Sequence, residues 1–419
     1  MTSSSLMSAM FKVLSTFVLC ATGLTAHAAE LHVLMGIDPS DLKNDMGATA
    51  SVAPAQSMTR AMGARATINQ IGVMAEAMRA SRTVENEIII APAHVTASAI
   101  LHAYQLIGSS GQVQAYALVA RNDIDEMSKL AHQRLYLPQQ DSLRSYVAKG
   151  LIVESGMTLN QFSKVTYGNT SGGGLVALMF KMADVTVASE TEAKEWIAAN
   201  PGQARILKTS RPVPSGLNIV ARKDWCATEC GRLTEWINSP DSAIAGLGRF
   251  RLASAEAAKQ FTYVASLGIT TPDAIQGVTR VSAETVANLV KQDVTFVDTR
   301  SQKEYDNEHI RGAVLAPYVE KSLKEINFDA SKDDFSALAG LKLDKSRPVV
   351  FFCNGPECWK SYKASRAAVK AGHTKVYWFR GGMPEWREKR LPVEGSNGAA
   401  VAKATAPAKP GPSRTVAER

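Results

Sequence analysis

The sequence predicts an α/β protein that folds as more than one compact unit, and three observations support this. The chain has 419 residues, which exceeds what one ordinary hydrophobic core takes up. Its composition is globular, with 45% apolar and 21% charged residues. Short β-rich runs alternate with helical stretches over most of its length, and strands separated by helices indicate α/β sheets with parallel strands.

The first 29 residues have the pattern of a secretory signal peptide. Lys12 precedes an apolar run at 13–24, and residues 26–28 (Ala-His-Ala) form a small-x-small cleavage pattern. The apolar run is shorter than the roughly 20 residues that span a bilayer, which disfavours a membrane anchor. We therefore expect the mature chain to begin near Ala29, to be periplasmic or secreted, and to have no stable membrane span.

Charge and cysteine content narrow the function classes. The net charge of +8 is spread along the chain without a basic, aromatic-rich cluster, so we expect no nucleic-acid partner. Beyond the signal, the cysteines form two close pairs, Cys226/Cys230 and Cys353/Cys358. Neither pair has the spacing of a zinc site or a haem attachment motif, so we expect no metal and no cofactor. A local disulfide is the leading interpretation for Cys226/Cys230, with free thiols as the alternative.

Residues 30 to about 265 alternate predicted strands and helices. The expected strands are rich in apolar and β-branched residues and lie at 31–35, 87–90, 113–119, 134–137, 164–167 and 217–221. Helical patterns lie at 67–80, 96–107 and 173–181.

Three segments of this region carry a family resemblance. They are 90–95 (Ile-Ala-Pro-Ala-His-Val), the strand 115–119 followed by Arg121, and 213–222 (Val-Pro-Ser-Gly-Leu-Asn-Ile-Val-Ala-Arg). Through them the region resembles the phosphonate-type periplasmic solute-binding proteins. The resemblance implies two α/β lobes around a cleft, a chain that crosses between them twice, and a small solute as ligand.

Polar residues near expected helix starts are the candidates for binding an oxyanionic solute. They are His94, Ser142, Arg144, Asn169, Thr170 and Ser171. The alternative is that the hydroxyl residues cap helices and that His94 is packed in the core.

Residues 266–276 are expected to link this domain to a second unit at 277–394, and the low-complexity stretch 395–419 is expected to be disordered. In the second unit a buried strand, 348–352, delivers Cys353 to its carboxyl end, where open α/β sheets place their sites. The loop 353–358 and a helix from Trp359 to about Ala371 follow. Loop N–H groups and the positive helix end are expected to lower the pKa of the Cys353 thiol and to stabilise a persulfide.

Four motifs of the second unit occur in a characteristic order: Val-Asp-Thr-Arg at 297–300, His-Ile-x-Gly-Ala at 309–313, the six-residue cysteine loop, and Gly-Gly-x-x-x-Trp at 381–386. This order resembles the rhodanese family, which implies an α/β domain with a parallel sheet. By resemblance, Cys353 carries sulfane sulfur from a donor to a thiol acceptor. The implied substrate-binding loop consists of Asn354, Gly355, Pro356, Glu357 and Trp359, and the implied structural residues are Asp298, His309, Gly381 and Gly382.

The cysteine loop departs from related families at three positions. Trp359 stands where the related cell-cycle phosphatases have a phosphate-gripping arginine, which disfavours phosphatase activity. Glu357 is expected to repel thiosulfate beside the pocket, an effect that Lys360 and Lys363 partly offset. Cys358 replaces a common arginine and is either a resolving thiol, which requires an outside reductant, or a packed residue.

We therefore expect an exported sulfurtransferase that carries sulfur on Cys353 and is fused to a domain that binds a small solute such as an oxyanion. Two alternatives stay open: a solute-binding protein with an idle rhodanese module, and a thiol-disulfide enzyme that uses Cys353 and Cys358.

Overall fold

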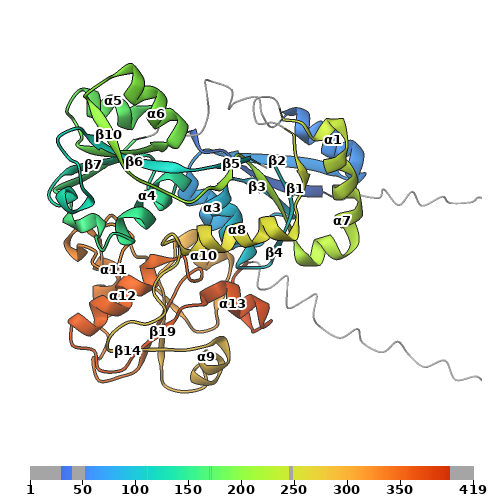
Figure 1. The fold of residues 1–419 in the computed structure, drawn as a ribbon. Coiled ribbons are helices and arrows are strands. Elements are labelled where there is room, and N and C mark those ends of the chain that lie inside the picture. Colours follow the sequence, from blue (N-terminus) through green and yellow to red (C-terminus); the bar gives the residue numbers. More distant parts are fainter. Residues whose placement is uncertain are drawn as a thin grey trace, which may run out of the picture.

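The computed structural model describes residues 30–39, 52–110, 112–168, 170, 172–244 and 249–396. The predicted signal peptide and all but the start of the predicted tail lie outside these residues. Figure 1 shows two α/β lobes and a C-terminal unit, coloured orange to red, that lies against both.

The first lobe contains a six-stranded mixed sheet with the order β13-β4-β12-β3-β1-β2. Its strands are β1 (Glu30–Gly36), β2 (Arg65–Ile71), β3 (Ile88–Ala91), β4 (Tyr104–Ser109), β12 (Asn218–Arg222) and β13 (Arg251–Leu252). Its helices are α1 (Val52–Met62), α2 (Met74–Ala80), α3 (Ala93–Ile100) and α7 (Lys223–Asn238). Every residue of β3 is buried, as expected for a central strand covered on both faces.

The second lobe contains a five-stranded mixed sheet with the order β10-β6-β9-β7-β8. Its strands are β6 (Tyr116–Arg121), β7 (Arg134–Leu137), β8 (Lys164–Tyr167), β9 (Val185–Ser189) and β10 (Ala204–Thr209). Its helices are α4 (Leu143–Val153), α5 (Gly173–Met179) and α6 (Glu190–Ala199).

The chain passes between the lobes twice, as the sequence predicted. The two crossing segments, β5 (Gln112–Gln114) and β11 (Val213–Ser215), pair antiparallel to each other. After the second lobe the chain returns to the first through β12, and helix α8 (Ala255–Ser266) then contacts α3. Helix α3 is therefore enclosed by α8 on one side and by its own sheet on another.

The C-terminal unit is built on a five-stranded sheet, β14-β19-β18-β15-β17, in which every paired strand is parallel. Its strands are β14 (Val278–Arg280), β15 (Thr295–Asp298), β17 (Val314–Leu315), β18 (Val349–Phe352) and β19 (Val376–Phe379). A separate antiparallel pair joins β16 (His309–Ile310) to β20 (Val393–Glu394). The helices are α9 (Ala283–Leu289), α10 (Gln302–Asn307), α11 (Ser336–Gly340), α12 (Trp359–Lys370) and α13 (Gly382–Glu388).

Strand β18 is the centre of this unit. Its four residues are fully or almost fully buried and alternate between two hydrophobic clusters, with Val350 and Phe352 on one face and Val349 and Phe351 on the other. Because both faces are covered, the carboxyl end of β18 is held rigidly where Cys353 follows.

Several secondary-structure predictions for the first domain were wrong. The helix predicted at 67–80 is strand β2 followed by helix α2, and the helix predicted at 96–107 ends at Ile100 before β4 begins. In both places pairing with a neighbouring strand, β1 or β12, overrides the local helical pattern. The expectation of parallel strands is also wrong in part, because β12 runs antiparallel to β3 and β4.

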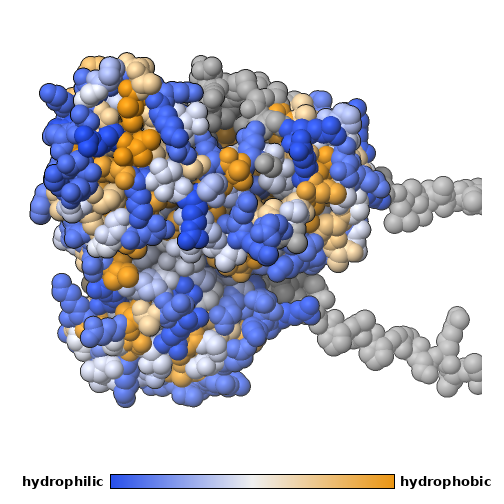
Figure 2. Space-filling model, in the orientation of Figure 1, coloured by the Kyte–Doolittle hydropathy of each residue, from blue (hydrophilic) through white to orange (hydrophobic). Residues whose placement is uncertain are grey.

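The surface is mixed in character. In Figure 2 apolar residues form scattered groups among hydrophilic ones on the face in view. Among the described residues, no helix is long and apolar enough to cross a membrane.

Candidate functional site

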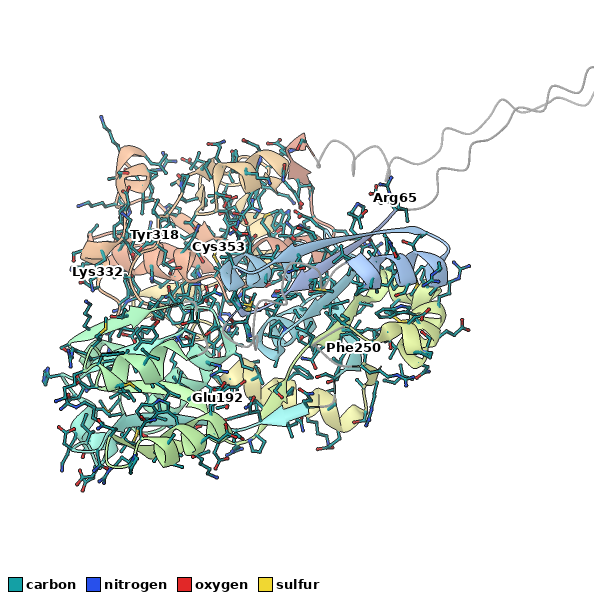
Figure 3. All side chains as sticks on the ribbon, turned by 90° about the horizontal axis from the view of Figure 1, so that it is seen from above. Arg65, Glu192, Phe250, Tyr318, Lys332 and Cys353 are labelled. Carbon is teal, nitrogen blue, oxygen red and sulfur yellow. A yellow bond between two sulfur atoms is a disulfide. The ribbon has the colours of Figure 1, made fainter. Side chains whose placement is uncertain are left out.

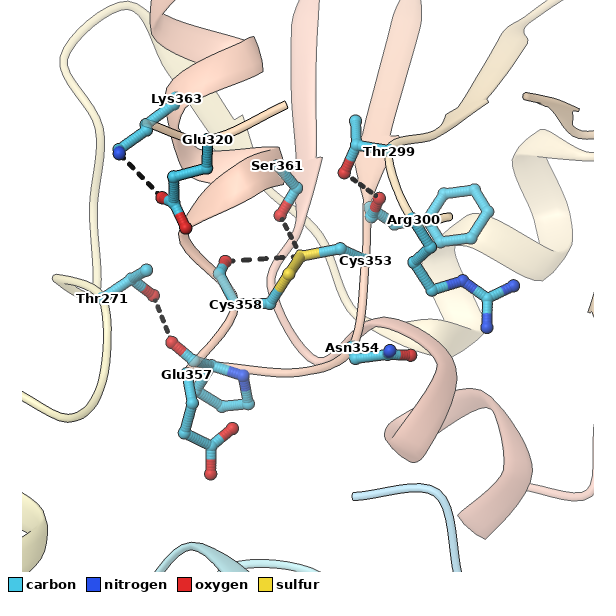
Figure 4. The surroundings of a disulfide bond; sticks show 12 residues. Thr271, Thr299, Arg300, Glu320, Cys353, Asn354, Glu357, Cys358, Ser361 and Lys363 are labelled. Atoms are coloured by element: carbon cyan, nitrogen blue, oxygen red, sulfur yellow. Dashed lines mark hydrogen bonds and ion pairs between the residues drawn. A yellow bond between two sulfur atoms is a disulfide. The ribbon is translucent and has the colours of Figure 1, made fainter. Parts of the chain in front are cut away.

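Cys353 lies directly after β18, at the carboxyl edge of the parallel sheet, and only 1% of its surface is exposed. It forms a disulfide with Cys358, and the Cα atoms of the two residues are 6.3 Å apart. Figure 4 shows this bond closing the loop between β18 and α12. Figure 3 shows Cys353 in the part of the C-terminal unit that borders the lobes.

The sulfur of Cys353 contacts the first turns of helix α12. Ser361 Oγ lies 3.0 Å from Cys353 Sγ, and the carbonyl oxygen of Cys358 lies 3.3 Å from it. The indole N–H of Trp378 donates to Ser361 Oγ over 3.0 Å. Since the indole is a donor only, Ser361 Oγ accepts this bond and keeps its own proton to donate, with the Cys353 sulfur within reach. The sequence analysis did not identify Ser361, although the sequence places this residue in the first turn of the helix that follows the cysteine loop.

The loop backbone is fixed from two sides. Gly355 has a φ of +83°, a conformation that favours glycine. The N–H and the hydroxyl of Thr271 both donate to the carbonyl oxygen of Pro356 over 2.8 Å. The N–H of Met383 donates to the carbonyl oxygen of Cys353 over 2.9 Å, and Gly382 passes so close to that carbonyl that a Cβ would overlap it. The predicted cradle of amide N–H groups around the sulfur stays a prediction.

Glu357 does not face the cysteine, contrary to the prediction that it lies beside the pocket. Its carboxylate points away from the disulfide in Figure 4 and accepts a hydrogen bond from Ser98 of the first lobe. Burial alone would raise the pKa of Glu357, but His102 and Arg82 outweigh it and lower that pKa. Lys363 is also turned away, because its ammonium is buried against Glu320, 2.7 Å away.

Asn354, Trp359 and Lys360 each have different surroundings. Asn354 is buried, and its side-chain amide donates to Glu304, while its Oδ1 has no hydrogen-bond partner among the described residues. Trp359 packs in a cluster with Tyr362 and Trp378. Burial lowers the pKa of Lys360.

Three of the residues that were expected to be structural have defined neighbours. Asp298 is completely buried and binds the guanidinium of Arg300, with a shortest distance of 2.7 Å. His309 Nδ1 lies 2.7 Å from the carbonyl oxygen of Tyr305, and its ring stacks on the Tyr305 ring with centroids 3.8 Å apart. Gly381 precedes α13 at a place where a Cβ would overlap Glu385.

This unit has a parallel sheet, a cysteine at the carboxyl end of the central strand and a helix that starts beside the sulfur. Residues 282–389 match the family described as "Rhodanese-like domain". The C-terminal unit is a rhodanese-like domain.

The chain is 33% identical over 112 residues to an HTH-type transcriptional regulator of Mycobacterium tuberculosis, a match that covers 27% of this chain and 42% of the regulator. It is 31% identical over 107 residues to an uncharacterized protein of Buchnera aphidicola, covering 25% of this chain and 63% of that protein. The chain therefore spans less than two thirds of either relative.

The two lobes have solved structural neighbours among binding proteins for phosphonates and sulfonates. One is PhnD1 from Prochlorococcus marinus in complex with methylphosphonate. It has 12% sequence identity and a TM-score of 0.44, and the match covers 57% of this chain and 97% of that one.

His94, the candidate from the first lobe, lies where the two lobes and the rhodanese-like domain meet. Its side chain is completely buried, and neither ring nitrogen has a hydrogen-bond partner within the described part of the chain. Its ring faces that of Tyr146 from helix α4, with centroids 5.9 Å apart. Burial lowers the pKa of His94 to about 3, although the nearby Asp141 carboxylate raises it slightly.

Sequence reasoning missed the charged groups around His94. Asp141 accepts a hydrogen bond from Tyr146 over 2.7 Å and binds the ammonium of Lys324 at 2.5 Å. Burial would raise the pKa of Asp141, but Lys324 and Tyr146 outweigh it and lower that pKa. Lys324 belongs to the rhodanese-like domain, so no pattern within the first domain could have indicated this pair.

Three of the remaining predicted solute residues, Ser142, Arg144 and Thr170, are among the described residues. Ser142 caps helix α4 by accepting the N–H of Ser145, which is the capping alternative. Arg144 is paired with Glu192 at 2.6 Å. Thr170 is exposed, whereas Asn169 and Ser171 lie outside the described residues.

Cys226 and Cys230 form a disulfide within helix α7, with Cα atoms 4.4 Å apart. No group of three or more His, Cys, Asp or Glu side chains that could hold a metal occurs in the part of the chain that the structure describes.

Proposed function

We propose that the chain is an exported sulfurtransferase that carries sulfane sulfur on Cys353. One observation carries this proposal: the Cys353 sulfur lies at the carboxyl end of the central parallel strand, within 3.0 Å of the Ser361 hydroxyl. A hydroxyl that donates to a sulfur stabilises its anion, and both a thiolate and a persulfide are anions at this position.

The proposed first half-reaction loads the cysteine. The Cys353 thiolate attacks the outer sulfur of a sulfane-sulfur donor, so that a new S–S bond forms and the bond between that sulfur and the rest of the donor breaks. The donor leaves with the bonding electron pair, and Cys353 carries a persulfide. A thiol acceptor then attacks the outer sulfur and releases the Cys353 thiolate.

Cys358 offers a second way to discharge the site. Its thiolate attacks the inner sulfur of the persulfide, which forms the Cys353–Cys358 disulfide and releases hydrosulfide with the electron pair of the broken bond. A dithiol reductant must then supply two electrons to restore both thiols. The disulfide between these residues supports this route.

The same disulfide favours a second candidate function, a thiol-disulfide enzyme in which Cys353 and Cys358 exchange electrons with other thiols. A third possibility is a solute-binding protein whose rhodanese-like domain is catalytically idle. In every case the N-terminal domain is proposed to bind a small solute, with an oxyanion as the leading class.

Persulfide detection separates these functions. The reduced full-length protein is treated with thiosulfate or another sulfane-sulfur donor and its peptides are weighed by mass spectrometry. The proposal expects a gain of one sulfur atom on Cys353 that is absent in Cys353→Ser and unchanged in the matched control Cys226→Ser. An unmodified Cys353 with every donor would overturn the transferase and leave the idle module or the thiol-disulfide enzyme.

Substitution of Cys358 tests the thiol-disulfide candidate. In Cys358→Ser the sulfurtransferase is expected to keep its Cys353 persulfide for longer, because the resolving attack is gone. A thiol-disulfide enzyme would instead lose all turnover with disulfide substrates. Transfer to an added thiol at the wild-type rate would show that Cys358 takes no part in it.

A further inference from the structure

The cysteine loop of the rhodanese-like domain is buried, and the first lobe lies against it at Glu357 and Gly355. Cys353, Asn354 and Glu357 are 1%, 4% and 5% exposed. A Cβ placed on Gly355 would come within 3.0 Å of the His102 ring. The space between the loop and the end of helix α3 is therefore too narrow for a substrate in this arrangement.

Glu357 is the centre of the contact with the first lobe. Ser98 Oγ donates to Glu357 Oε1 over 3.1 Å, and His102 Nε2 lies 2.9 Å from the same oxygen. Arg82 adds a guanidinium nitrogen 3.9 Å from Oε2. Ser98 and His102 are four residues apart, which places them on one face of α3 and its end. The carboxylate side chain is only 1% exposed, so water competes little with these partners.

A second set of contacts joins the rhodanese-like domain to the second lobe. Lys149 of helix α4 donates to the carbonyl oxygen of Lys324 and lies over the Trp359 ring, 5.0 Å from its centroid. The ammonium of Lys324 binds Asp141, and Glu325 accepts the N–H of Leu159 over 3.0 Å. The rhodanese-like domain is thus attached to both lobes at once.

We propose that the N-terminal domain is a gate over Cys353, and that the contacts of Glu357 with Ser98, His102 and Arg82 are its latch. The proposal rests on the proposed function only in that it concerns access to the same cysteine. The three partners are positioning residues, because they act on the loop through Glu357 and do not touch the sulfur.

Because the rhodanese-like domain is attached to both lobes, a change in the angle between the lobes would act on the gate. The latch lies on the first lobe, whereas Lys324 and Glu325 are held by the second. If a solute changes the angle between the lobes, the rigid rhodanese-like domain cannot keep both sets of contacts. Solute binding would then change the fraction of molecules in which Cys353 is accessible.

Alkylation of Cys353 in the reduced full-length protein tests the gate without requiring any sulfur transfer. A small thiol reagent modifies a covered cysteine at a rate proportional to the open fraction. We expect His102→Ala and Glu357→Gln to raise the alkylation rate of Cys353 by about ten-fold, since the first removes a hydrogen bond to the buried carboxylate and the second removes the charge that pairs with Arg82. The matched control His132→Ala changes an exposed histidine of the second lobe, and its rate should equal that of the wild type.

Hydrogen exchange provides a second measurement if one variant folds poorly. Amides of residues 354–358 are expected to exchange faster in Ser98→Ala and His102→Ala, whereas amides of the central strand β18 should be unchanged. Alkylation at the rate of an unhindered thiol in the wild type, or equal rates in wild type and both latch variants, would overturn the gate.

The outcomes for gate and function are distinguishable. If alkylation changes as expected but no donor ever adds sulfur to Cys353 in His102→Ala, the gate holds and the transferase fails. If every variant forms persulfide and is alkylated at one common rate, the transferase holds and the gate fails.

Discussion

Two places in this chain share a local design: a buried strand with a parallel neighbour is followed by a helix, and a chemically versatile residue lies between the strand and the second residue of that helix. In the first lobe β3 leads to His94 near the start of α3, and in the rhodanese-like domain β18 leads to Cys353 before α12. Both side chains are almost fully buried. They differ in their partners, because the Cys353 sulfur contacts Ser361 and Cys358, while the ring nitrogens of His94 have no hydrogen-bond partner among the described residues.

The difference shows that position at the carboxyl end of a strand does not by itself fix the surroundings of a side chain. Cys353 has a hydroxyl beside its sulfur, and the Ser361 Oγ that lies there accepts a hydrogen bond from the Trp378 indole. The surroundings of His94 disfavour a charge, and burial holds its pKa near 3. A buried polar group without partners is costly, and in the described part of the first domain both ring nitrogens of His94 are in this state.

The largest expected effect comes from removing the sulfur of Cys353. Cys353→Ser should lower sulfur transfer by at least ~10³-fold, because serine cannot form a persulfide. Transfer is measured as sulfide or thiocyanate released per unit time, with Cys226→Ser as the control that removes a structural disulfide. Activity left in Cys353→Ser would contradict the assignment of the nucleophile.

His94 should make the protein sensitive to acid. Its folded-state pKa is about 3, below the ordinary value of 6.5, so the unfolded chain binds its proton first as pH falls. Stability attributable to His94 is complete above pH 6.5 and is lost between about pH 6.5 and 3, by on the order of 5 kcal/mol. His94→Gln should flatten this part of the plot of melting temperature against pH.

The control for that series is His132→Gln, whose side chain is exposed and should leave the acid slope unchanged. The Asp141 carboxylate also loses its favourable pairing in acid, but only below its ordinary pKa near 3.8. An identical slope above pH 4 in wild type and His94→Gln would refute the buried neutral histidine.

Ser361→Ala should raise the pKa of the Cys353 thiol by roughly 1–2 units, because a hydrogen bond to a charged group is worth about 1.5–3 kcal/mol. The measurement is the pH titration of thiolate absorbance in Cys358→Ser, where the disulfide cannot form. Ser365→Ala is a matched control one turn further along α12, since its hydroxyl donates to the backbone of Ser361 and not to the sulfur. An unchanged titration would mean that Ser361 does not stabilise the anion.

The smallest effect is expected at Ser142. As the cap of α4 it should contribute about 1 kcal/mol, so Ser142→Ala lowers the unfolding free energy by that amount. Ser254→Ala, which removes the equivalent cap of α8, is the comparison. A change in solute affinity in Ser142→Ala at unchanged stability would instead make it a ligand residue.

The sequence predicted correctly those features whose contacts lie within a short stretch of the chain, and it failed where the contacts join distant stretches. The order of motifs from Val297 to Trp386 indicated the rhodanese-like domain, because strand, loop and helix there follow one another within a few residues. In the first domain the residues of β2 and β4 were taken for helix, since their pairing partners lie far away in the sequence. Periodicity within one segment carries no information about such partners.

The sequence by itself determined the position of Cys353 between a buried strand and a helix, because apolar patterning and glycine placement act over short distances. The tertiary structure alone decided where Glu357 points: its partners Ser98 and His102 lie more than 250 residues earlier in the chain. From the sequence alone, a carboxylate close to a reactive cysteine is expected to form part of its pocket. Only the packing of the two domains, which brings a helix of the first against the loop of the second, makes it a contact between them.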